Sequence, residues 1–146
     1  MIKISIATIL VIFNLPLFTT SNTPAPTAKV QAGGDLAASI KKGQTVYSSY
    51  CIACHQANGA GLDPAFPPLA KSDYLMADAK RAIAIVMHGK SGEITVNGKK
   101  YNGQMPDFGL NDEQITDVLN YVRNSWGNKG KAITVAEVKA VRAAKK

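Results

Sequence analysis

Two cysteines and a histidine are the residues of this chain whose types and spacing most clearly predict chemistry. Cys51 and Cys54 are separated by two residues, and His55 follows directly. Two thiols on one turn of backbone can each add to one vinyl group of a porphyrin, and the next imidazole can bind the iron from the same side. The chain has 2 cysteines in all, so no second pair completes a zinc site, and a small disulfide loop would leave the histidine unexplained. The motif therefore predicts one covalently attached haem c, with His55 as the proximal iron ligand.

The second axial ligand is expected from a loop, because it has to cross the other face of the porphyrin. Met105 lies between Gly103 and Pro106, and a thioether is a soft ligand that raises the potential of a histidine-ligated iron. His88 is the other histidine of the chain, but it falls at the end of a predicted helix, where the helix dipole favours an imidazole. Met87, on the same helix, is expected in the core. We therefore expect Met105 to be the sixth ligand, with His88 as the alternative.

A loop rich in glycine and proline, residues 56–72, follows the motif and is expected to cover the haem. Its apolar side chains Phe66 and Leu69 are predicted to lie against the porphyrin. A backbone carbonyl of this loop can accept a hydrogen bond from Nδ1 of His55, which fixes the tautomer and tunes the iron. Pro67 is the favoured source of that carbonyl and Pro68 the second; the alternative is that both prolines only shape a surface loop.

Hydrophobic periodicity predicts a first helix over residues 35–50, which leads into the motif. Asp35 is the expected N-cap and Tyr47 an expected core aromatic. Gly43 inside a helix costs roughly 1 kcal/mol relative to alanine, so it predicts the close approach of another helix.

The middle of the chain is predicted to hold a helix and a hairpin. The helix is expected within 73–88, most clearly from its sixth residue onward, and Gly89 would end it. Residues 93–101 alternate around Asn97 and Gly98, which predicts a β-hairpin with a type I′ turn.

A further helix is expected over residues 112–125, capped by Asn111 and ended by Gly127. Val118 and Tyr121 on this helix are spaced to meet the face of the first helix that carries its glycine and tyrosine.

The last residues, 129–146, are predicted to form a basic tail helix opened by a capping box of Thr134 and Glu137. Residues 127–146 carry six basic side chains against one acidic, whereas residues 22–126 carry ten basic and nine acidic. The formal charge of +7 therefore comes mostly from the tail, and the nearly neutral body argues against nucleic-acid binding. We expect the tail to be a solvated amphipathic appendage; docking to an acidic partner is the alternative.

The first 21 residues have the layout of a secretory signal, with a positive start, an apolar run and small residues after it. The run is short for a membrane span, so cleavage near Ser21 is expected, and an uncleaved membrane anchor is the alternative. Residues 22–34, rich in Thr, Pro, Ala and Gly, predict a flexible linker. Because haem is attached to such motifs outside the bacterial cytoplasm, we expect a periplasmic protein.

These features together resemble the class I, mitochondrial-like cytochromes c, over nearly all of a domain predicted at residues 35–128. The likeness rests on Gly43 with Tyr47, the motif at 51–55, the proline loop, Met105 with Pro106, and Val118 with Tyr121. Three strings, 66–70, 96–106 and 121–128, are similar to bacterial periplasmic haem domains that serve dehydrogenases or are appended to copper nitrite reductases. The resemblance implies an all-α fold: a small helical bundle around one covalent haem, with crossed first and last helices and a short β-hairpin inserted before the axial methionine.

The resemblance also implies an electron carrier without a catalytic site. Electrons would pass at the haem edge near Cys51, Ile52 and Cys54, during transient docking with a reductase, a dehydrogenase or a terminal oxidase. Two alternatives are a haem enzyme or gas sensor with an open sixth position, and a fixed haem subunit of a larger oxidoreductase. The side chains considered for contacts to the haem propionates are Tyr74, Tyr101, Arg81 and Trp126.

Overall fold

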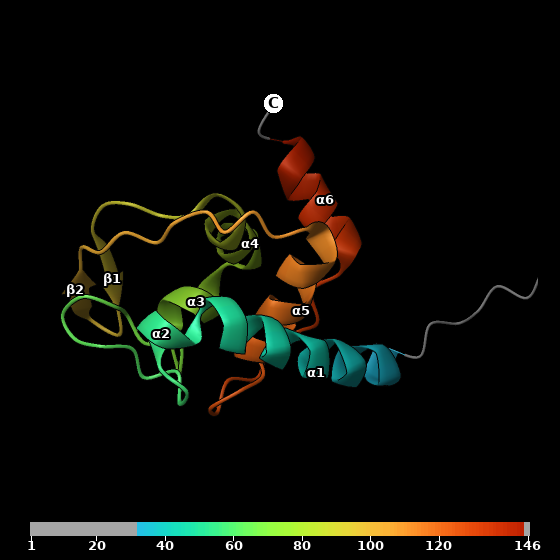
Figure 1. Ribbon diagram of the computed structural model, residues 1–146, viewed down its shortest axis with the longest axis horizontal. Helices are drawn as coiled ribbons and strands as arrows, with labels where there is room; N and C mark the ends of the chain where they lie inside the picture. Colours follow the sequence, from blue (N-terminus) through green and yellow to red (C-terminus); the bar gives the residue numbers. More distant parts are fainter. Residues whose placement is uncertain (1–31, 145–146) are drawn as a thin grey trace, which may run out of the picture.

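The computed structural model describes the backbone of residues 32–144 and the side chains of residues 35–144. The described part is mainly helical, with one small two-stranded sheet, so the all-α prediction is confirmed (Figure 1). The predicted signal and most of the predicted linker lie outside the described residues. None of the helices within residues 32–144 is long and apolar enough to cross a membrane.

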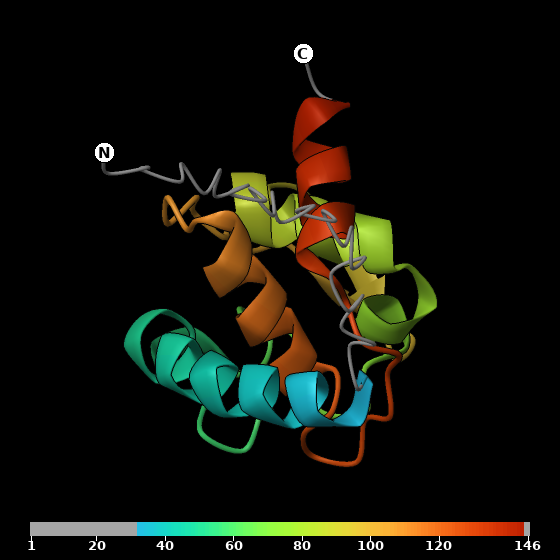
Figure 2. The ribbon, with the colours of Figure 1, turned by 90° about the vertical axis from the view of Figure 1, so that its right-hand side faces the viewer.

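The first helix and the fifth cross in close contact. Helix α1 spans Ala32–Tyr50 and α5 spans Asp112–Val122, and Figure 2 shows α5 rising across α1. A Cβ atom at Gly43 would lie 1.9 Å from the carbonyl oxygen of Asp117, so only glycine allows this approach. The rings of Tyr47 and Tyr121 meet there with centroids 5.3 Å apart, as the spacing predicted.

The ends of these two helices differ from the predictions. Helix α1 begins at Ala32, so Asp35 is not its N-cap. Asp35 lies in the first turn, where its carboxylate interacts favourably with the helix dipole. Helix α5 ends at Val122, before the predicted end, because side chains donate hydrogen bonds to carbonyl groups that would accept backbone N–H groups in a longer helix. Asn128 Nδ2 donates to the Val122 carbonyl at 2.7 Å, and Ser125 Oγ donates to the carbonyl of Tyr121 at 2.7 Å.

Three short helices lie between these two. Helix α2 spans Ile52–His55, α3 spans Asp73–Ala77 and α4 spans Ala79–His88. The helix expected within 73–88 is therefore divided in two at Asp78, which is extended, with φ −144° and ψ 108°. Its side chain accepts a hydrogen bond from the backbone N–H of Arg81 and so caps α4. Gly89 ends α4 with a φ of 74°, as predicted.

The predicted hairpin is present between α4 and α5. Strand β1, Ile94–Val96, pairs in antiparallel register with β2, Lys99–Tyr101. Asn97 and Gly98 between the strands have φ values of 50° and 77°, as a type I′ turn requires. The hairpin is joined to α3 because the backbone N–H of Asn97 donates to Asp73 Oδ1 at 2.8 Å.

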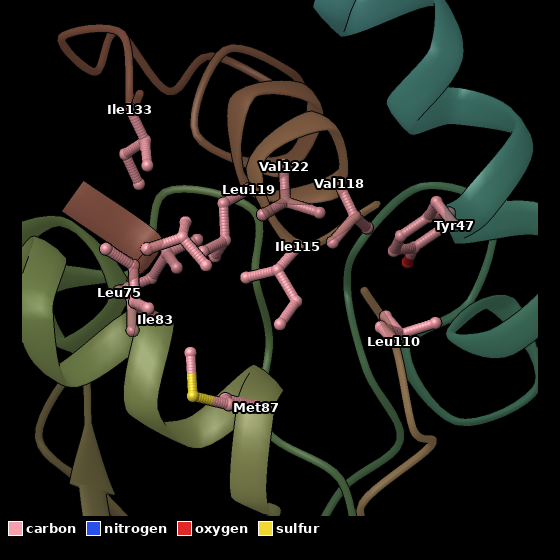
Figure 3. Close-up of a cluster of buried hydrophobic side chains, with 12 residues drawn as sticks. Tyr47, Leu75, Ile83, Met87, Leu110, Ile115, Val118, Leu119, Val122 and Ile133 are labelled. Carbon is pink, nitrogen blue, oxygen red and sulfur yellow. The ribbon is translucent and has the colours of Figure 1, made fainter. Parts of the chain in front are cut away.

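The last helix, α6, spans Val135–Ala143 and has the predicted capping box, but it is not a solvated appendage. Val138 is 0 % exposed and Ile133, just before the helix, is 4 % exposed. Figure 3 shows Ile133 pointing into the same cluster as Leu119 and Leu75. The helix packs against α4 and α5, so these apolar side chains leave water and stabilise the fold. The buried core cluster consists of Tyr47, Leu75, Ala82, Ile83, Met87, Leu110, Ile115, Val118, Leu119, Val122, Ile133 and Val138.

Candidate functional site

One large apolar cavity opens between α2, the proline loop, α4 and the connection from β2 to α5. Its empty volume, including the open mouth, is about 1200 Å³. In Figure 1 the connection that follows β2 crosses the molecule on the side away from α2. The predicted site residues all line this cavity: Cys51, Cys54, His55, Pro67, Leu69 and Met105, together with Phe66 and Pro68.

His55 is held in one orientation by the proline loop. Its Nδ1 lies 3.0 Å from the carbonyl oxygen of Pro67, the hydrogen bond that the sequence predicted. A carbonyl can only accept, so Nδ1 carries the proton and Nε2 keeps its lone pair for a metal ion. Burial lowers the pKa of His55, and the hydrogen bond to Pro67 opposes part of that effect. Burial therefore favours the neutral imidazole, and the hydrogen bond to Pro67 leaves Nε2 as the nitrogen that is free to bind a metal ion.

The two cysteine thiols lie half-buried at the junction of α1 and α2, beside His55. Burial raises the pKa of the Cys51 thiol to about 11, and the neighbouring Cys54 adds to the rise. The backbone N–H groups of Cys54 and His55 both point to the Cys51 carbonyl, at 3.3 Å and 2.9 Å. The motif thus forms one tight turn, as addition of both thiols to one porphyrin edge requires.

Two residues that fix this wall of the cavity were not predicted to do so. The hydroxyl of Tyr47, expected only as a core aromatic, donates to the carbonyl of Gln56 at 2.6 Å. Asn128 Nδ2 donates to the carbonyl of Leu69 at 2.8 Å as well as to that of Val122. Tyr47 therefore holds the residue after His55, and Asn128 joins the proline loop to the end of α5. Neither contact follows a sequence period, because each depends on a loop carbonyl brought near by the fold.

Met105 is positioned by backbone pairing. The N–H of Lys90 donates to the Met105 carbonyl and the N–H of Met105 to the Lys90 carbonyl, each at 2.8 Å. Gly89 comes so close that a Cβ atom there would lie 2.4 Å from the Met105 carbonyl oxygen. His88, the alternative ligand, does not line the cavity; it faces a separate crevice between α4 and α6. Met87 lies in the core, as predicted, and is 3 % exposed.

A cation on the cavity wall tests whether the cavity fits a haem, which carries two propionate carboxylates. Arg81 lies on the cavity wall, with Nη2 donating to the Tyr74 carbonyl at 2.6 Å and the guanidinium 3.9 Å above the Tyr74 ring. Its Nε is buried and has no hydrogen-bond partner among residues 35–144. Of the four propionate candidates, Arg81, Tyr74 and Tyr101 line the cavity, and Trp126 does not. An apolar cavity with a buried donor lacking an acceptor fits a flat, apolar group that carries carboxylates.

A sequence model of the cytochrome c family matches residues 40–126, the region that builds this cavity. The chain belongs to the cytochrome c family. Members of this family bind a haem c covalently, so the cofactor of this chain is one haem c with its iron, at the CIACH motif. This match confirms the resemblance to the cytochromes c that the sequence motifs indicated.

The relatives of this cytochrome include a cytochrome c-552 and cytochrome c subunits of dehydrogenases. Cytochrome c-552 of Thermus thermophilus is 42% identical over 122 residues, which cover 77% of this chain and 82% of that protein. The cytochrome c subunit of gluconate 2-dehydrogenase from Pantoea cypripedii is 38% identical over 106 residues, or 68% of this chain. The cytochrome c subunit of a quinone alcohol dehydrogenase from Gluconacetobacter polyoxogenes is 31% identical over 121 residues, or 80% of this chain. The matches span only 24% and 25% of the two dehydrogenase subunits.

Proposed function

We propose that this cytochrome carries single electrons between redox proteins, with its haem iron ligated by His55 and Met105. When bound, the haem supplies a one-electron Fe(III)/Fe(II) couple. The observation that carries the proposal is that a histidine with a free Nε2 and a methionine from a distant loop line one apolar cavity. With both axial positions occupied, the protein offers no open site to a substrate, so we propose a carrier and not an enzyme.

The roles of the other residues in this proposal follow from their contacts. Cys51 and Cys54 would form the thioether bonds to the haem. The Pro67 carbonyl accepts the hydrogen bond from Nδ1–H of His55. Leu69 belongs to the apolar wall that keeps water from the iron. Arg81 provides a buried donor for a haem carboxylate. Exclusion of water limits solvent rearrangement when the charge of the site changes.

The proposed docking surface surrounds the thioether edge of the cavity. Tyr50 and Ile52 flank Cys51 and are exposed, at 40% and 36%. The ring of Tyr50 packs on Phe108 with centroids 5.8 Å apart, so the patch continues onto the loop that carries Met105. This patch suits a small transient interface with a redox partner such as a dehydrogenase. Because residues 22–126 are nearly balanced in charge, with ten basic and nine acidic side chains, we expect partner turnover to depend only weakly on salt.

We further propose that the protein works outside the bacterial cytoplasm, after export by the segment at residues 1–21. The support is the apolar run and small residues of that segment, together with the attachment chemistry of the motif. Mass spectrometry of the exported holoprotein tests this directly. A mass that lacks the first 21 residues would support cleavage; a full-length mass would support retention as an anchor.

The optical spectrum of the holoprotein tests the proposed ligation. We expect a low-spin spectrum, with a weak sulfur-to-iron band in the red when the protein is oxidised. The spectrum of the reduced protein should not change when carbon monoxide is added. Met105→Ala should lose the band and bind carbon monoxide, while His88→Ala, the matched control, should behave like the parent protein. Ready binding of carbon monoxide by the parent protein would contradict the proposal and favour an enzyme or gas sensor with an open sixth position.

A further inference from the structure

The C-terminal helix reaches the loop that carries the proposed sixth ligand. We propose that α6, through Arg142, is a positioning element that holds residues 105–111 and thereby controls how readily Met105 leaves the iron. This inference rests on the proposed ligation by Met105. It assigns a role to a segment that lies beyond the region matched by the family model, residues 40–126.

The segment before α6 is fixed to the domain by one buried amide. Asn120, 2 % exposed on α5, accepts a hydrogen bond from the Ile133 N–H at 2.7 Å and donates to the Ile133 carbonyl at 3.0 Å. The same Nδ2 donates to Ser39 Oγ on α1 at 3.0 Å. The amide pairs with Ile133 as a neighbouring strand would, and burial of Val138 then holds the helix in place. The start of α6 is therefore rigidly placed against α5.

From this position Arg142 joins α6 to the end of the methionine loop. Its Nε donates to Asp112 Oδ1 at 2.8 Å, and its Nη2 donates to the Leu110 carbonyl at 3.4 Å. Asp112 is the first residue of α5, and its side chain is 17% exposed. Leu110 belongs to the buried core cluster. One guanidinium thus fixes both the last loop residues and the first residue of the following helix.

The other end of the same loop is held near α6 as well. Met105 pairs with Lys90, two residues after α4, and α6 packs on α4. Val141 and Ala144 share a crevice with Ile85 of α4, whose side chain also lines the haem cavity. Between these two anchors the loop lacks regular structure. The loop is therefore tied to α6 directly at Leu110 and indirectly, through α4 and Lys90, at Met105. We expect Met105 to leave the iron more readily when either tie is broken.

Binding of imidazole to the oxidised holoprotein tests the inference, because imidazole competes with Met105 for the iron. We expect Arg142→Gln to raise the imidazole association constant roughly three- to tenfold. This factor corresponds to the loss of a half-exposed ion pair and one hydrogen bond. Asp112→Asn should have a similar or smaller effect, and the double variant should be no worse than Arg142→Gln alone, because both substitutions remove the contact between Arg142 and Asp112.

Two controls separate positioning from loss of charge or stability. Lys139→Gln removes an exposed charge from the same helix, in a residue that makes no ion pair among residues 35–144. Ser125→Ala removes the hydrogen bond to the Tyr121 carbonyl near the C-terminal end of α5, and Ser125 makes no contact with α6 or the methionine loop in our proposal. We expect both to bind imidazole like the parent protein, although Ser125→Ala should lower the urea midpoint of unfolding about as much as Arg142→Gln.

The possible outcomes are distinct. Parent-like imidazole binding by Arg142→Gln, or an equal rise in Ser125→Ala, would overturn the inference and leave α6 with a purely structural role. The same titration on Met105→Ala sets the upper limit. If the parent protein already binds as tightly as Met105→Ala, the proposed ligation itself fails, and the inference fails with it for a different reason.

Discussion

The two walls of the haem cavity are built in different ways. On the histidine wall, the Pro67 carbonyl that orients His55 is twelve residues away, and Tyr47 adds a second contact at Gln56. On the methionine wall, Met105 pairs with Lys90, and in our proposal the loop also depends on Arg142 of α6. The first wall is built mainly within residues 47–67 and is completed by one covalent anchor, whereas the second also needs the packing of α6. We therefore predict that Met105 leaves the iron more readily than His55 does.

The largest effect is expected where the packing supports both walls. Gly43→Val would place side-chain atoms against the backbone of Asp117 and should destabilise the holoprotein by about 3 kcal/mol or more, enough to lower its yield sharply. Urea unfolding followed by the haem absorbance would measure the loss. Thr45→Val, an exposed position on the same helix, is the control and should be close to neutral.

A matched pair of glycines compares the two walls directly. A Cβ atom at Gly89 would lie 2.4 Å from the Met105 carbonyl oxygen, and one at Gly61 would lie 2.7 Å from the Pro67 carbonyl oxygen. Both glycines have positive φ values, 74° and 69°, so alanine strains the backbone similarly at each. We expect Gly89→Ala to weaken the methionine bond and admit carbon monoxide, whereas Gly61→Ala should keep both ligands.

Gly61→Ala should instead raise the reduction potential. A longer hydrogen bond from His55 to Pro67 makes the imidazole a weaker donor, which disfavours the oxidised iron. Loss of about 1 kcal/mol corresponds to roughly 40 mV for one electron. Redox titration measures the shift. If Gly61→Ala admitted carbon monoxide and Gly89→Ala did not, the histidine wall would be the weaker of the two, contrary to our prediction.

The smallest effect is expected from the hydroxyl of Tyr47. Tyr47→Phe keeps the ring contacts with Tyr121 and Trp126 but removes the hydrogen bond to Gln56, and should cost about 1 kcal/mol of unfolding free energy. Because the histidine remains covalently tethered beside Cys54, the spectrum should not change. Thermal unfolding and the optical spectrum together check both statements; a change in spin state would mean that the tyrosine controls ligation.

The same difference explains what the sequence could predict. The cysteine motif, the Pro67 contact, the hairpin and the crossing at Gly43 depend on residues with a specific local chemistry, and each was predicted. The division of one expected helix at Asp78 was missed because an aspartate that caps a helix looks like an ordinary solvent-facing residue in a periodic pattern. Both neighbouring helices are apolar enough to be read as one.

The buried position of α6 was missed because composition dominates that segment. Its basic residues predict a solvated tail, yet two apolar side chains, Ile133 and Val138, suffice to bury one face. The partner that fixes it is Asn120, a polar residue in the middle of the buried face of α5, and its paired hydrogen bonds appear only in three dimensions. Long-range anchors of this kind have no signal in a single sequence.

The most direct test of the account is the proton NMR spectrum of the reduced holoprotein. A methionine methyl group bound to a low-spin haem iron lies over the porphyrin, whose ring current shifts its resonance far upfield. We predict one such three-proton signal, absent from Met105→Leu and retained in Met76→Leu and Met87→Leu, which remove methionines outside the cavity lining. Its persistence in Met105→Leu, or its absence from the parent protein, would contradict the proposed ligation and the comparison built on it.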